Sequence, residues 1–279
     1  MISKKSVCKR IFLYLTILLL LCLFIFPIYW MIIASLKDNS VLMRNPPQLY
    51  PTFSTFDNYM TMLGNAKYLG YIRNSIIVAS GTVIVDLILS VLGGYSLSRF
   101  NFPGRKTIMI AILSAQIFPV VVIIISLYGF FSKMKLMNTY TGLVLADVAM
   151  SLPLSVWMLK SFCDNVPMSL DEAAKIDGCS RWKTLTYIVF PLLKPGLLAI
   201  GIYSFLMSWD DYLIALVIMN KSGMKTLPVG IAETFLGEFG FDYAGMMTIS
   251  VIASLPVLLL FMIFQKYMVS GLTGGAIKE

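Results

Sequence analysis

Six stretches of the chain run for 23 to 26 residues without a lysine or arginine, and they constrain the fold more than any other feature. They cover residues 11–36, 74–98, 107–132, 136–159, 195–220 and 243–265. A helix needs roughly 20 mostly apolar residues to cross a hydrocarbon core about 30 Å thick. Each stretch therefore has the length of a transmembrane helix. Backbone groups must satisfy one another in lipid, which makes a helix the form that fits these lengths.

The composition excludes the main alternatives to a membrane protein. Hydrophobic residues make up 58% of the 279 positions and charged residues only 13%, about half the charged share of an ordinary soluble domain. So few polar residues cannot cover the surface of a soluble globule, and disordered chains are poor in aliphatic and aromatic residues. We predict an all-α polytopic membrane protein with six transmembrane helices, organised as a single domain over residues 1–279.

The distribution of basic residues predicts the orientation in the membrane. An even number of spans places both termini on one side. Fourteen of the 22 lysines and arginines lie on that side, in the N-terminal segment, residues 99–106, residues 160–194 and the C-terminal tail. Because basic residues accumulate on the cytoplasmic face, we expect both termini to be cytoplasmic. The net charge of +8 then reflects this bias and attraction to acidic lipids.

Several kinds of chemistry have no residues to carry them. The chain contains no histidine, so histidine metal sites and histidine acid–base catalysis are excluded. It also lacks the G-x-x-x-x-G-K-[ST] pattern of a phosphate-binding loop, so we expect no ATP bound by this chain, no metal and no enzymatic activity. The four cysteines, Cys8, Cys22, Cys163 and Cys179, have no C-x-x-C spacing, and none falls in a predicted external loop, so we expect no disulfide.

The loop between the fourth and fifth predicted spans, residues 160–194, is far longer than a connection within a bundle needs. Pro167 marks a helix start, and acidic residues follow in the first turn, where the helix dipole favours them. Gly178 is suited to a left-handed helix stop, and Ser180 can cap a second helix. This pattern predicts a cytoplasmic helix–turn–helix. The residues alone leave two interpretations open, an amphipathic hairpin anchored in the membrane surface and a surface that docks a partner.

The same loop carries a recognisable motif. Glu172, Ala173 and Ala174, followed at fixed spacing by Gly178, Ile188 and Pro191, resemble the EAA loop of ABC importer permeases, whose pattern is E-A-A-x3-G-x9-I-x-L-P. Phe190 stands where leucine is usual in the family. The extended form E-A-A-x-I-D-G, followed by Pro191, Leu192 and Pro195, resembles the carbohydrate-uptake branch of the family. Three further segments agree with the family, Phe26–Lys37, Ile72–Ala79 and Phe205–Ile218. The tail Gly271–Glu279 resembles that of the second permease of the pair in maltose-type importers.

The resemblance implies a division of labour with partner subunits. A second permease subunit would complete a heterodimer, two cytoplasmic ATPase subunits would bind ATP and Mg, and an extracytoplasmic solute-binding protein would deliver the solute. It implies that the loop is a coupling helix seated on the ATPase, with coupling residues Glu172, Ala173, Ala174, Asp177, Gly178, Ile188 and Pro191. In the tail, Gly271, Leu272, Thr273, Gly274 and Gly275 would contact the ATPase. The implied location is the bacterial inner membrane.

Carboxylates inside the predicted spans need an explanation, because a charged aspartate at the bilayer centre costs roughly 2.5–3.5 kcal/mol. Trp209, Asp210, Asp211 and Tyr212 form a candidate translocation path, in which carboxylates suit sugar hydroxyls and aromatic rings suit sugar faces. The alternative is a carboxylate satisfied by backbone or hydroxyl donors where helices pack. We favour that alternative for Asp86 and Asp147.

The solute itself is left open by the residues. An ATP-driven importer of a sugar or oligosaccharide is the first hypothesis, and a permease for a non-sugar solute such as glycerol phosphate is the second. An ion-coupled secondary carrier would use the membrane aspartates as relay groups. Against the carrier, the first and last three spans show no convincing self-similarity of the kind that inverted-repeat carriers often have.

Overall fold

The computed structural model describes residues 4–46, 48–50, 55–235 and 242–274. Helices and short connections account for this part of the chain, and it contains no strand, so the all-α prediction is confirmed. Four continuous helices are long and apolar enough to cross a membrane, and two bent helix pairs raise the number to six if each pair is one span. The four are Lys9–Ser35, Ala66–Arg99, Tyr140–Asp164 and Tyr243–Gln265.

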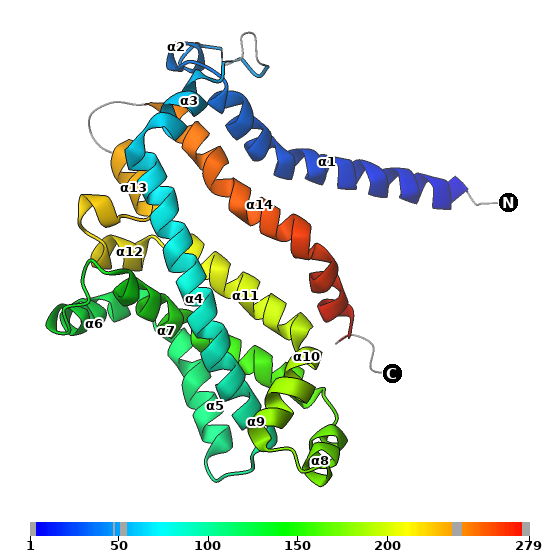
Figure 1. The fold of residues 1–279 in the computed structure, drawn as a ribbon. Helices are drawn as coiled ribbons and strands as arrows, with labels where there is room; N and C mark the ends of the chain where they lie inside the picture. Colours follow the sequence, from blue (N-terminus) through cyan, green and yellow to red (C-terminus); the bar gives the residue numbers. More distant parts are fainter. Residues whose placement is uncertain (1–3, 47, 51–54, 236–241, 275–279) are drawn as a thin grey trace. The chain divides into compact units, whose positions relative to one another are not determined.

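The chain divides into two compact units (Figure 1). The first comprises residues 1–69 and 231–255, and the second comprises residues 70–230 and 256–279. Helices of the first unit are α1 Lys4–Ser35, α2 Asn39–Leu42 and α3 Asp57–Gly64. Three helices contribute to both units, α4 Ala66–Arg99, α13 Leu227–Phe235 and α14 Tyr243–Gly274.

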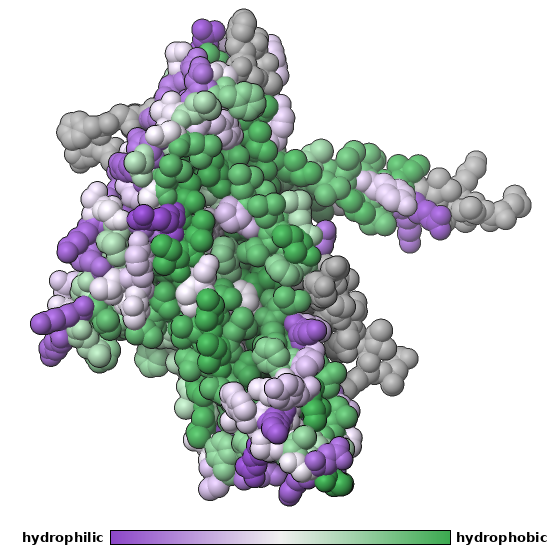
Figure 2. Space-filling view, viewed as in Figure 1, coloured by the Kyte–Doolittle hydropathy of each residue, from purple (hydrophilic) through white to green (hydrophobic). Residues whose placement is uncertain are grey.

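The remaining elements lie in the second unit. They are α5 Arg105–Ser114, η1 Ala115–Ile117, α6 Val120–Lys133, α7 Tyr140–Asp164, α8 Met168–Ile176, α9 Arg181–Lys183, the π-helix η2 Thr184–Val189, α10 Phe190–Leu192, α11 Lys194–Trp209, α12 Leu213–Ile218 and η3 Ser222–Met224. Within this unit α7 and α11 pack against each other over much of their length (Figure 1). Hydrophilic residues are present at the end that carries α8 and α9, and hydrophobic residues cover much of the surface beyond it (Figure 2).

Polar contacts hold the first unit together at the end of α1. The Ser35 hydroxyl lies 2.7 Å from the Tyr59 hydroxyl, and the Ser35 carbonyl accepts hydrogen bonds from Asn58 and Thr248. The apolar side chains over most of α1 are exposed. A helix that is apolar on every side suits lipid or another protein chain.

Two apolar clusters form the core of the second unit. The first joins α4, α6, α7, α12 and α13 around Val78, Phe131, Leu143 and Ile218. The other joins α4, α7, the π-helix and α11, and it contains Tyr95, Leu159, Cys163, Leu185, Val189 and Ile200. The helices approach closely here because Gly94 has no side chain. A Cβ added at Gly94 would lie 2.9 Å from the Leu159 Cβ and from the Lys160 backbone nitrogen.

Two of the predicted stretches contain a break for identifiable reasons. In residues 107–132 the helix is interrupted at Phe118 and Pro119, and the two halves meet at 101°. Proline cannot donate a backbone hydrogen bond and drives the preceding residue to an extended conformation, which Phe118 adopts. In residues 195–220, α11 ends at Trp209 and α12 begins at Leu213. Asp210–Tyr212 therefore form a connection between two helices, although the sequence predicts one continuous span over residues 195–220.

Candidate functional site

The first half of the predicted coupling loop is a helix with a defined stop. α8 begins at Met168 after Pro167, whose missing N–H is no loss at a helix start. Gly178 follows the helix at φ +77°. Its N–H donates to the Lys175 carbonyl at 3.2 Å, and the Cys179 N–H donates to the Ala174 carbonyl at 2.9 Å. These two bonds form a Schellman motif, in which glycine adopts the left-handed conformation at the least cost.

The second half of the loop is a helix with an irregular centre. Ser180 caps it, since its hydroxyl accepts a hydrogen bond from the Lys183 N–H at 3.3 Å. Residues Thr184–Val189 form a π-helix, a geometry that recurs at functional sites. Helix Arg181–Leu192 then meets Lys194–Trp209 at 80°. Pro191 and Pro195 flank this bend and lack the N–H that a continuous helix would use. The helix–turn–helix predicted for this loop is present.

An ion pair ties the first helix of the loop to α4. Arg99, in the last turn of α4, lies 3.1 Å from the Asp171 carboxylate, and only 5% and 16% of the two side chains are exposed. The Tyr95 hydroxyl donates to the same carboxylate at 3.0 Å. Arg99 also donates to the Val166 carbonyl at 2.9 Å. The guanidinium therefore connects α4 to both the end of α7 and the start of α8, and beneath it Cys163 is fully buried.

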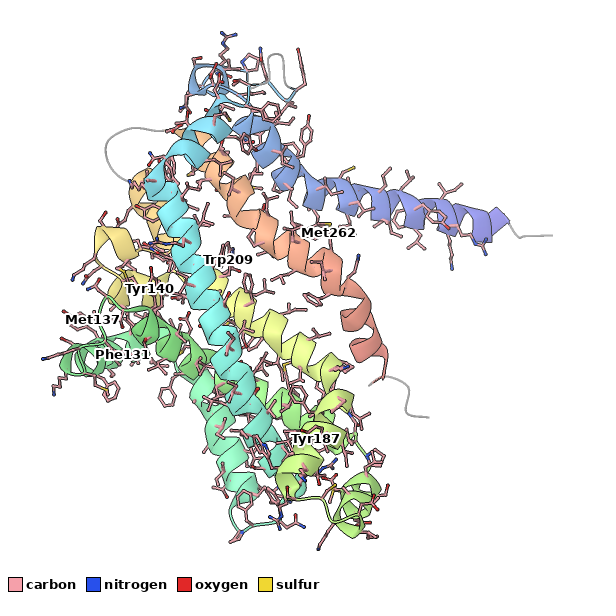
Figure 3. The ribbon with its side chains drawn as sticks, in the orientation of Figure 1. Phe131, Met137, Tyr140, Tyr187, Trp209 and Met262 are labelled. Atoms are coloured by element: carbon pink, nitrogen blue, oxygen red, sulfur yellow. The ribbon has the colours of Figure 1, made fainter. Side chains whose placement is uncertain are left out.

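The outer side of the loop is exposed and mixes charge with large apolar groups. Of the predicted coupling residues, Glu172, Ala173, Asp177, Gly178 and Pro191 are exposed, Ile188 is half-buried and Ala174 is 2% exposed. Three large side chains of the same loop are highly exposed, Ile176 at 87%, Tyr187 at 78% and Trp182 at 64%. Tyr187 is labelled in Figure 3. Leu185 and Val189, on the opposite side of the second helix of the loop, are buried in the apolar cluster with α4, α7 and α11.

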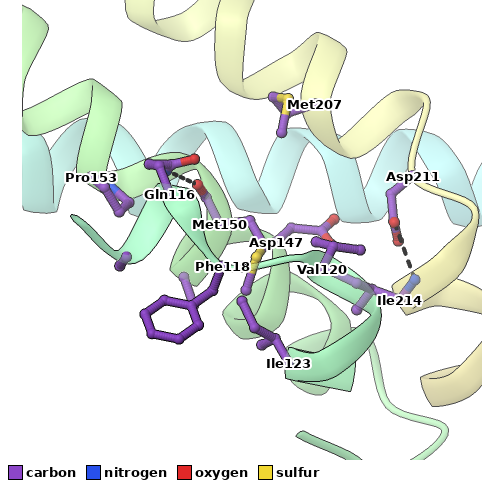
Figure 4. Close-up of a pocket in the computed structure, with 12 residues that line it drawn as sticks. Gln116, Phe118, Val120, Ile123, Asp147, Met150, Pro153, Met207, Asp211 and Ile214 are labelled. Atoms are coloured by element: carbon purple, nitrogen blue, oxygen red, sulfur yellow. Dashed lines mark hydrogen bonds between the residues drawn. The ribbon is translucent and has the colours of Figure 1, made fainter. Parts of the chain in front are cut away.

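A cavity of about 360 Å³ opens among η1, α6, α7, α11 and α12 (Figure 4). Asp147 and Asp211 line it, together with Gln116, Phe118, Met150 and Met207. Asp211 accepts hydrogen bonds from the backbone N–H groups of Ile214 and Ala215, at 3.2 and 2.7 Å, and so caps α12. Among the described residues, the lining has two acidic side chains and no basic one. Carboxyl groups in a lining of this kind can form hydrogen bonds with a solute rich in hydroxyl groups.

The four candidate path residues are placed differently from one another. Asp211 lines the cavity, whereas Asp210 is exposed and Tyr212 is 37% exposed. Trp209 is buried and stacks on Phe205, with ring centroids 5.5 Å apart. The structure thus brings Asp211 together with Asp147, a residue for which the sequence favoured a packing role, and it does not bring all four path residues to one wall.

Serine hydroxyls hold the buried carboxylates of α4 and α7. Ser208 donates to one oxygen of Asp147 at 2.6 Å, while Ser155 and Ser204 both donate to one oxygen of Asp86. For Asp86 and Asp147 the sequence favours carboxylates satisfied by hydroxyl donors where helices pack, and the structure shows such donors at both. Within the described residues, the second carboxylate oxygen of each aspartate has no hydrogen-bond partner. In Asp147 that oxygen belongs to a side chain that lines the cavity.

Sequence reasoning missed Tyr95, Arg99 and Gln116. In the sequence, Arg99 indicated only where a span ends. A base in the last turn of a helix interacts favourably with the helix dipole, and this could have drawn attention to it. Gln116 donates to the Met150 carbonyl at 2.8 Å across the cavity, and no local pattern marks it. In the tail, the backbone of Gly271, Leu272, Thr273 and Gly274 belongs to the last turn of α14, and Gly275 lies outside the described residues. The described residues contain no cluster of three or more metal-ligating side chains.

Long apolar helices, a helix–turn–helix loop with the E-A-A-x3-G spacing, and a cavity among bent helices define a membrane permease. The chain belongs to the family of binding-protein-dependent transport system inner membrane components, which it matches over residues 87–274. It is a permease subunit of an ABC importer.

Curated relatives extend this likeness over nearly the whole chain. The trehalose/maltose transport system permease protein MalG of Thermococcus litoralis is 37% identical over 99% of both chains. The arabinooligosaccharides transport system permease protein AraQ of Bacillus subtilis is 33% identical over 96% of both chains. Among solved structures, a chain of a bacterial ABC transporter involved in the import of the acidic polysaccharide alginate has the same fold. It gives a TM-score of 0.85 at 20% identity and covers 96% of this chain and 99% of that one.

Proposed function

We propose that this permease passes a sugar or oligosaccharide through the membrane and receives the driving force through its EAA loop. The observation that carries the solute class is the cavity lined by Asp147 and Asp211 without a base. A carboxyl group exchanges hydrogen bonds with sugar hydroxyls whether or not it is protonated, and the described lining offers no base that would bind an anionic solute. Relatives named for trehalose, maltose and arabinooligosaccharides support the same class.

The coupling role rests on the exposed side of α8. Glu172 lies on a helix that Arg99 holds in place through Asp171, and the surrounding surface exposes Ile176, Trp182 and Tyr187. Aromatic anchors around a charge are typical of protein interfaces. We infer that this surface docks on a cytoplasmic ATPase subunit that binds ATP and Mg. A lipid-anchored hairpin would not need the buried ion pair that orients α8.

The remaining partners follow from the family. We infer that a second permease subunit completes the translocation path, that two ATPase subunits hydrolyse ATP, and that an extracytoplasmic binding protein delivers the sugar. A chain of the same fold, with a TM-score of 0.67, belongs to a bacterial alginate ABC transporter solved in complex with an alginate pentasaccharide-bound periplasmic protein, which supports the inference of a binding protein. A glycerol phosphate permease is the weaker alternative, because the described lining of the cavity offers a phosphate no base.

The solute class predicts the outcome of a neutral substitution in the cavity. Asp147→Asn keeps the side-chain volume and replaces the carboxyl group with an amide, so uptake of the sugar should fall about tenfold. The physical reason is that a buried polar group left without its hydrogen-bond partner costs about 1–3 kcal/mol, and about 1.4 kcal/mol is a factor of ten. Uptake by the assembled importer is measured with trehalose and maltose as first probes and glycerol phosphate as the anionic comparison.

The matched control is Asp210→Asn, which removes the neighbouring exposed carboxylate that does not line the cavity. It should leave sugar uptake nearly unchanged. Transport of glycerol phosphate in preference to both sugars by the unmodified protein would contradict the proposed solute class. A loss in Asp210→Asn but not in Asp147→Asn would place the path elsewhere.

The proposed orientation, with both termini cytoplasmic, predicts a pattern of thiol labelling. In a variant without its own cysteines, Met43→Cys and Gly223→Cys should react with a membrane-impermeant reagent in whole cells. Phe102→Cys and Lys183→Cys should react only after permeabilisation, because the basic side of the protein faces the cytoplasm. The reverse pattern would invert the topology.

A further inference from the structure

A second hollow, of about 720 Å³, lies in the second unit where α4 ends and α5 begins. Its lining comes from the last turns of α4, the connecting turn, the first turns of α5, and Lys160 on α7. Neither the cavity with Asp147 nor the exposed side of α8 shares this lining. It is therefore a separate site, about which the proposed function makes no statement.

The hollow is basic. Arg105, Lys106 and Lys160 line it, and no carboxylate does. Lys160 is paired with Asp164, which also accepts a hydrogen bond from Ser98 at 2.6 Å. Arg105 donates to the Asn101 side chain at 3.1 Å, and its charge also acts on the Asp164 carboxylate beside the hollow. Three bases against this one carboxylate leave an excess of two positive charges among the described residues at the hollow.

Arg105 and Lys106 also occupy the end of a helix where positive charge is disfavoured. They are the first two residues of α5, whose N-cap is Gly104 at φ +84° with no side chain to cap the helix. The N-terminus of a helix carries a partial positive charge and unsatisfied N–H groups. Bases at this position repel the dipole unless an anion lies between them. The helix dipole and the two basic side chains place positive charge at the same point, and together they make a site for an anion.

Apolar side chains form much of the remaining lining, which limits the kind of anion. They are Leu97, Phe102, Met109 and Ile110, and the polar Asn101 and Thr107 lie among them. Immediately beyond the bases, Ile108 and Ile110 are 44% and 65% exposed along α5, the helix with which a predicted span begins. A small soluble anion would leave these walls unused. An amphiphile would place its charged group at the bases and its chains along the helix.

We propose that this hollow binds the headgroup of an anionic phospholipid, with Arg105 and Lys106 as the residues that hold its phosphate. Basic pockets between helices on the cytoplasmic side are suited to such headgroups. The hollow and its bases are independent of the proposed function. The placement of the lipid in the cytoplasmic leaflet rests on the proposed orientation of the chain. The bound lipid ties the α4–α5 turn to Lys160, one turn before α7 leads into the coupling loop. The lipid therefore stabilises the platform on which α8 is held.

The test uses the complete importer reconstituted in nanodiscs of phosphatidylcholine containing phosphatidylglycerol, followed by native mass spectrometry of retained lipid. The unmodified protein should retain phosphatidylglycerol in preference to phosphatidylcholine. Arg105→Gln with Lys106→Gln should weaken this retention by about 30-fold, which corresponds to about 1 kcal/mol for each base at an anionic membrane surface. The swap Arg105→Lys with Lys106→Arg keeps the charges and should preserve most of the retention.

The matched control is Lys9→Gln with Arg10→Gln, which also removes two bases near the end of a predicted span. This control variant should retain as much phosphatidylglycerol as the unmodified protein. If acidic lipid were attracted only by the overall positive charge, the two double variants would lose retention equally, and that result would overturn the proposal. Displacement of the lipid by inorganic phosphate at constant ionic strength would show a free anion site instead. If the variant of Arg105 and Lys106 does not insert into the membrane, the lipid preference of the unmodified protein is the test. Retention by that protein without preference for phosphatidylglycerol overturns the proposal.

Discussion

Replacing Glu172 with alanine should lower ATP-driven uptake by about a hundredfold or more while membrane insertion remains normal. In the proposed complex this carboxylate faces a basic group in a docking cleft that excludes water. Removing one member of a buried charge pair costs about 3–5 kcal/mol, against about 0–1 kcal/mol for an exposed pair. A change of about 1.4 kcal/mol is a factor of ten. Uptake and co-purification of the ATPase subunit, at matched expression, measure the effect.

Gly178→Val should do comparable damage for a different reason. A Cβ at Gly178 would meet no atom within 4 Å, so steric overlap is not the cause. The backbone at φ +77° is the cause, because a β-branched residue resists the left-handed conformation that ends α8. Gly129→Val is the matched control, since Gly129 also has open space around it but an ordinary φ.

A membrane-anchored hairpin predicts a different result for the same variants. The loss of one charge would then favour contact with lipid, and Glu172→Ala would transport normally. Glu172→Gln, which keeps the side-chain length, separates charge from shape. Normal uptake by Glu172→Ala with its ATPase still bound would show that the coupling role assigned to this residue is wrong.

Arg99→Met should release the first helix of the coupling loop from α4. The substitution keeps an apolar stem but leaves the Asp171 carboxylate without its ion-pair partner in a position that is only 16% exposed. The expected cost is about 3–5 kcal/mol. Because the fully buried Cys163 lies in the apolar cluster beneath this loop, local opening should raise its labelling rate by about two orders of magnitude or more.

The labelling is measured with a membrane-permeant thiol reagent in a variant in which the other three cysteines are serine. Arg99→Met with Asp171→Leu removes both charges and should recover part of the protection, since an apolar pair can replace a buried ion pair. Lys183→Met, an exposed base of the same loop, should leave Cys163 protected. Unchanged labelling in Arg99→Met would mean that apolar packing alone holds the loop.

Local signals allowed the loop and the spans to be predicted. Pro167, Gly178 and Ser180 act through backbone geometry and hydrogen bonds to residues within five positions, so the chain segment itself specifies the helix–turn–helix. The lengths of the apolar stretches likewise depend on composition alone. The break at Phe118 and Pro119 was within reach of the same reasoning, because proline disrupts a helix wherever it occurs in the interior.

The candidate cavity needed the tertiary structure. Asp147 and Asp211 are distant in sequence, and they meet only because α7 packs along α11 and because α11 ends at Trp209 instead of continuing. The serines that hold Asp86 come from two other helices. No periodicity within one helix indicates which partner a buried carboxylate will find.

The sequence by itself determined that the chain is a helical membrane permease with an exposed EAA loop, because hydrophobic length, turn geometry and motif spacing are properties of contiguous residues. Only the tertiary structure decided that Arg99 orients this loop through Asp171, and that the cavity has two carboxylates and no base in its lining. Both depend on which helix faces lie against each other. Side-chain packing selects those faces among α4, α7 and α11, whose apolar surfaces are alike in sequence but differ in shape.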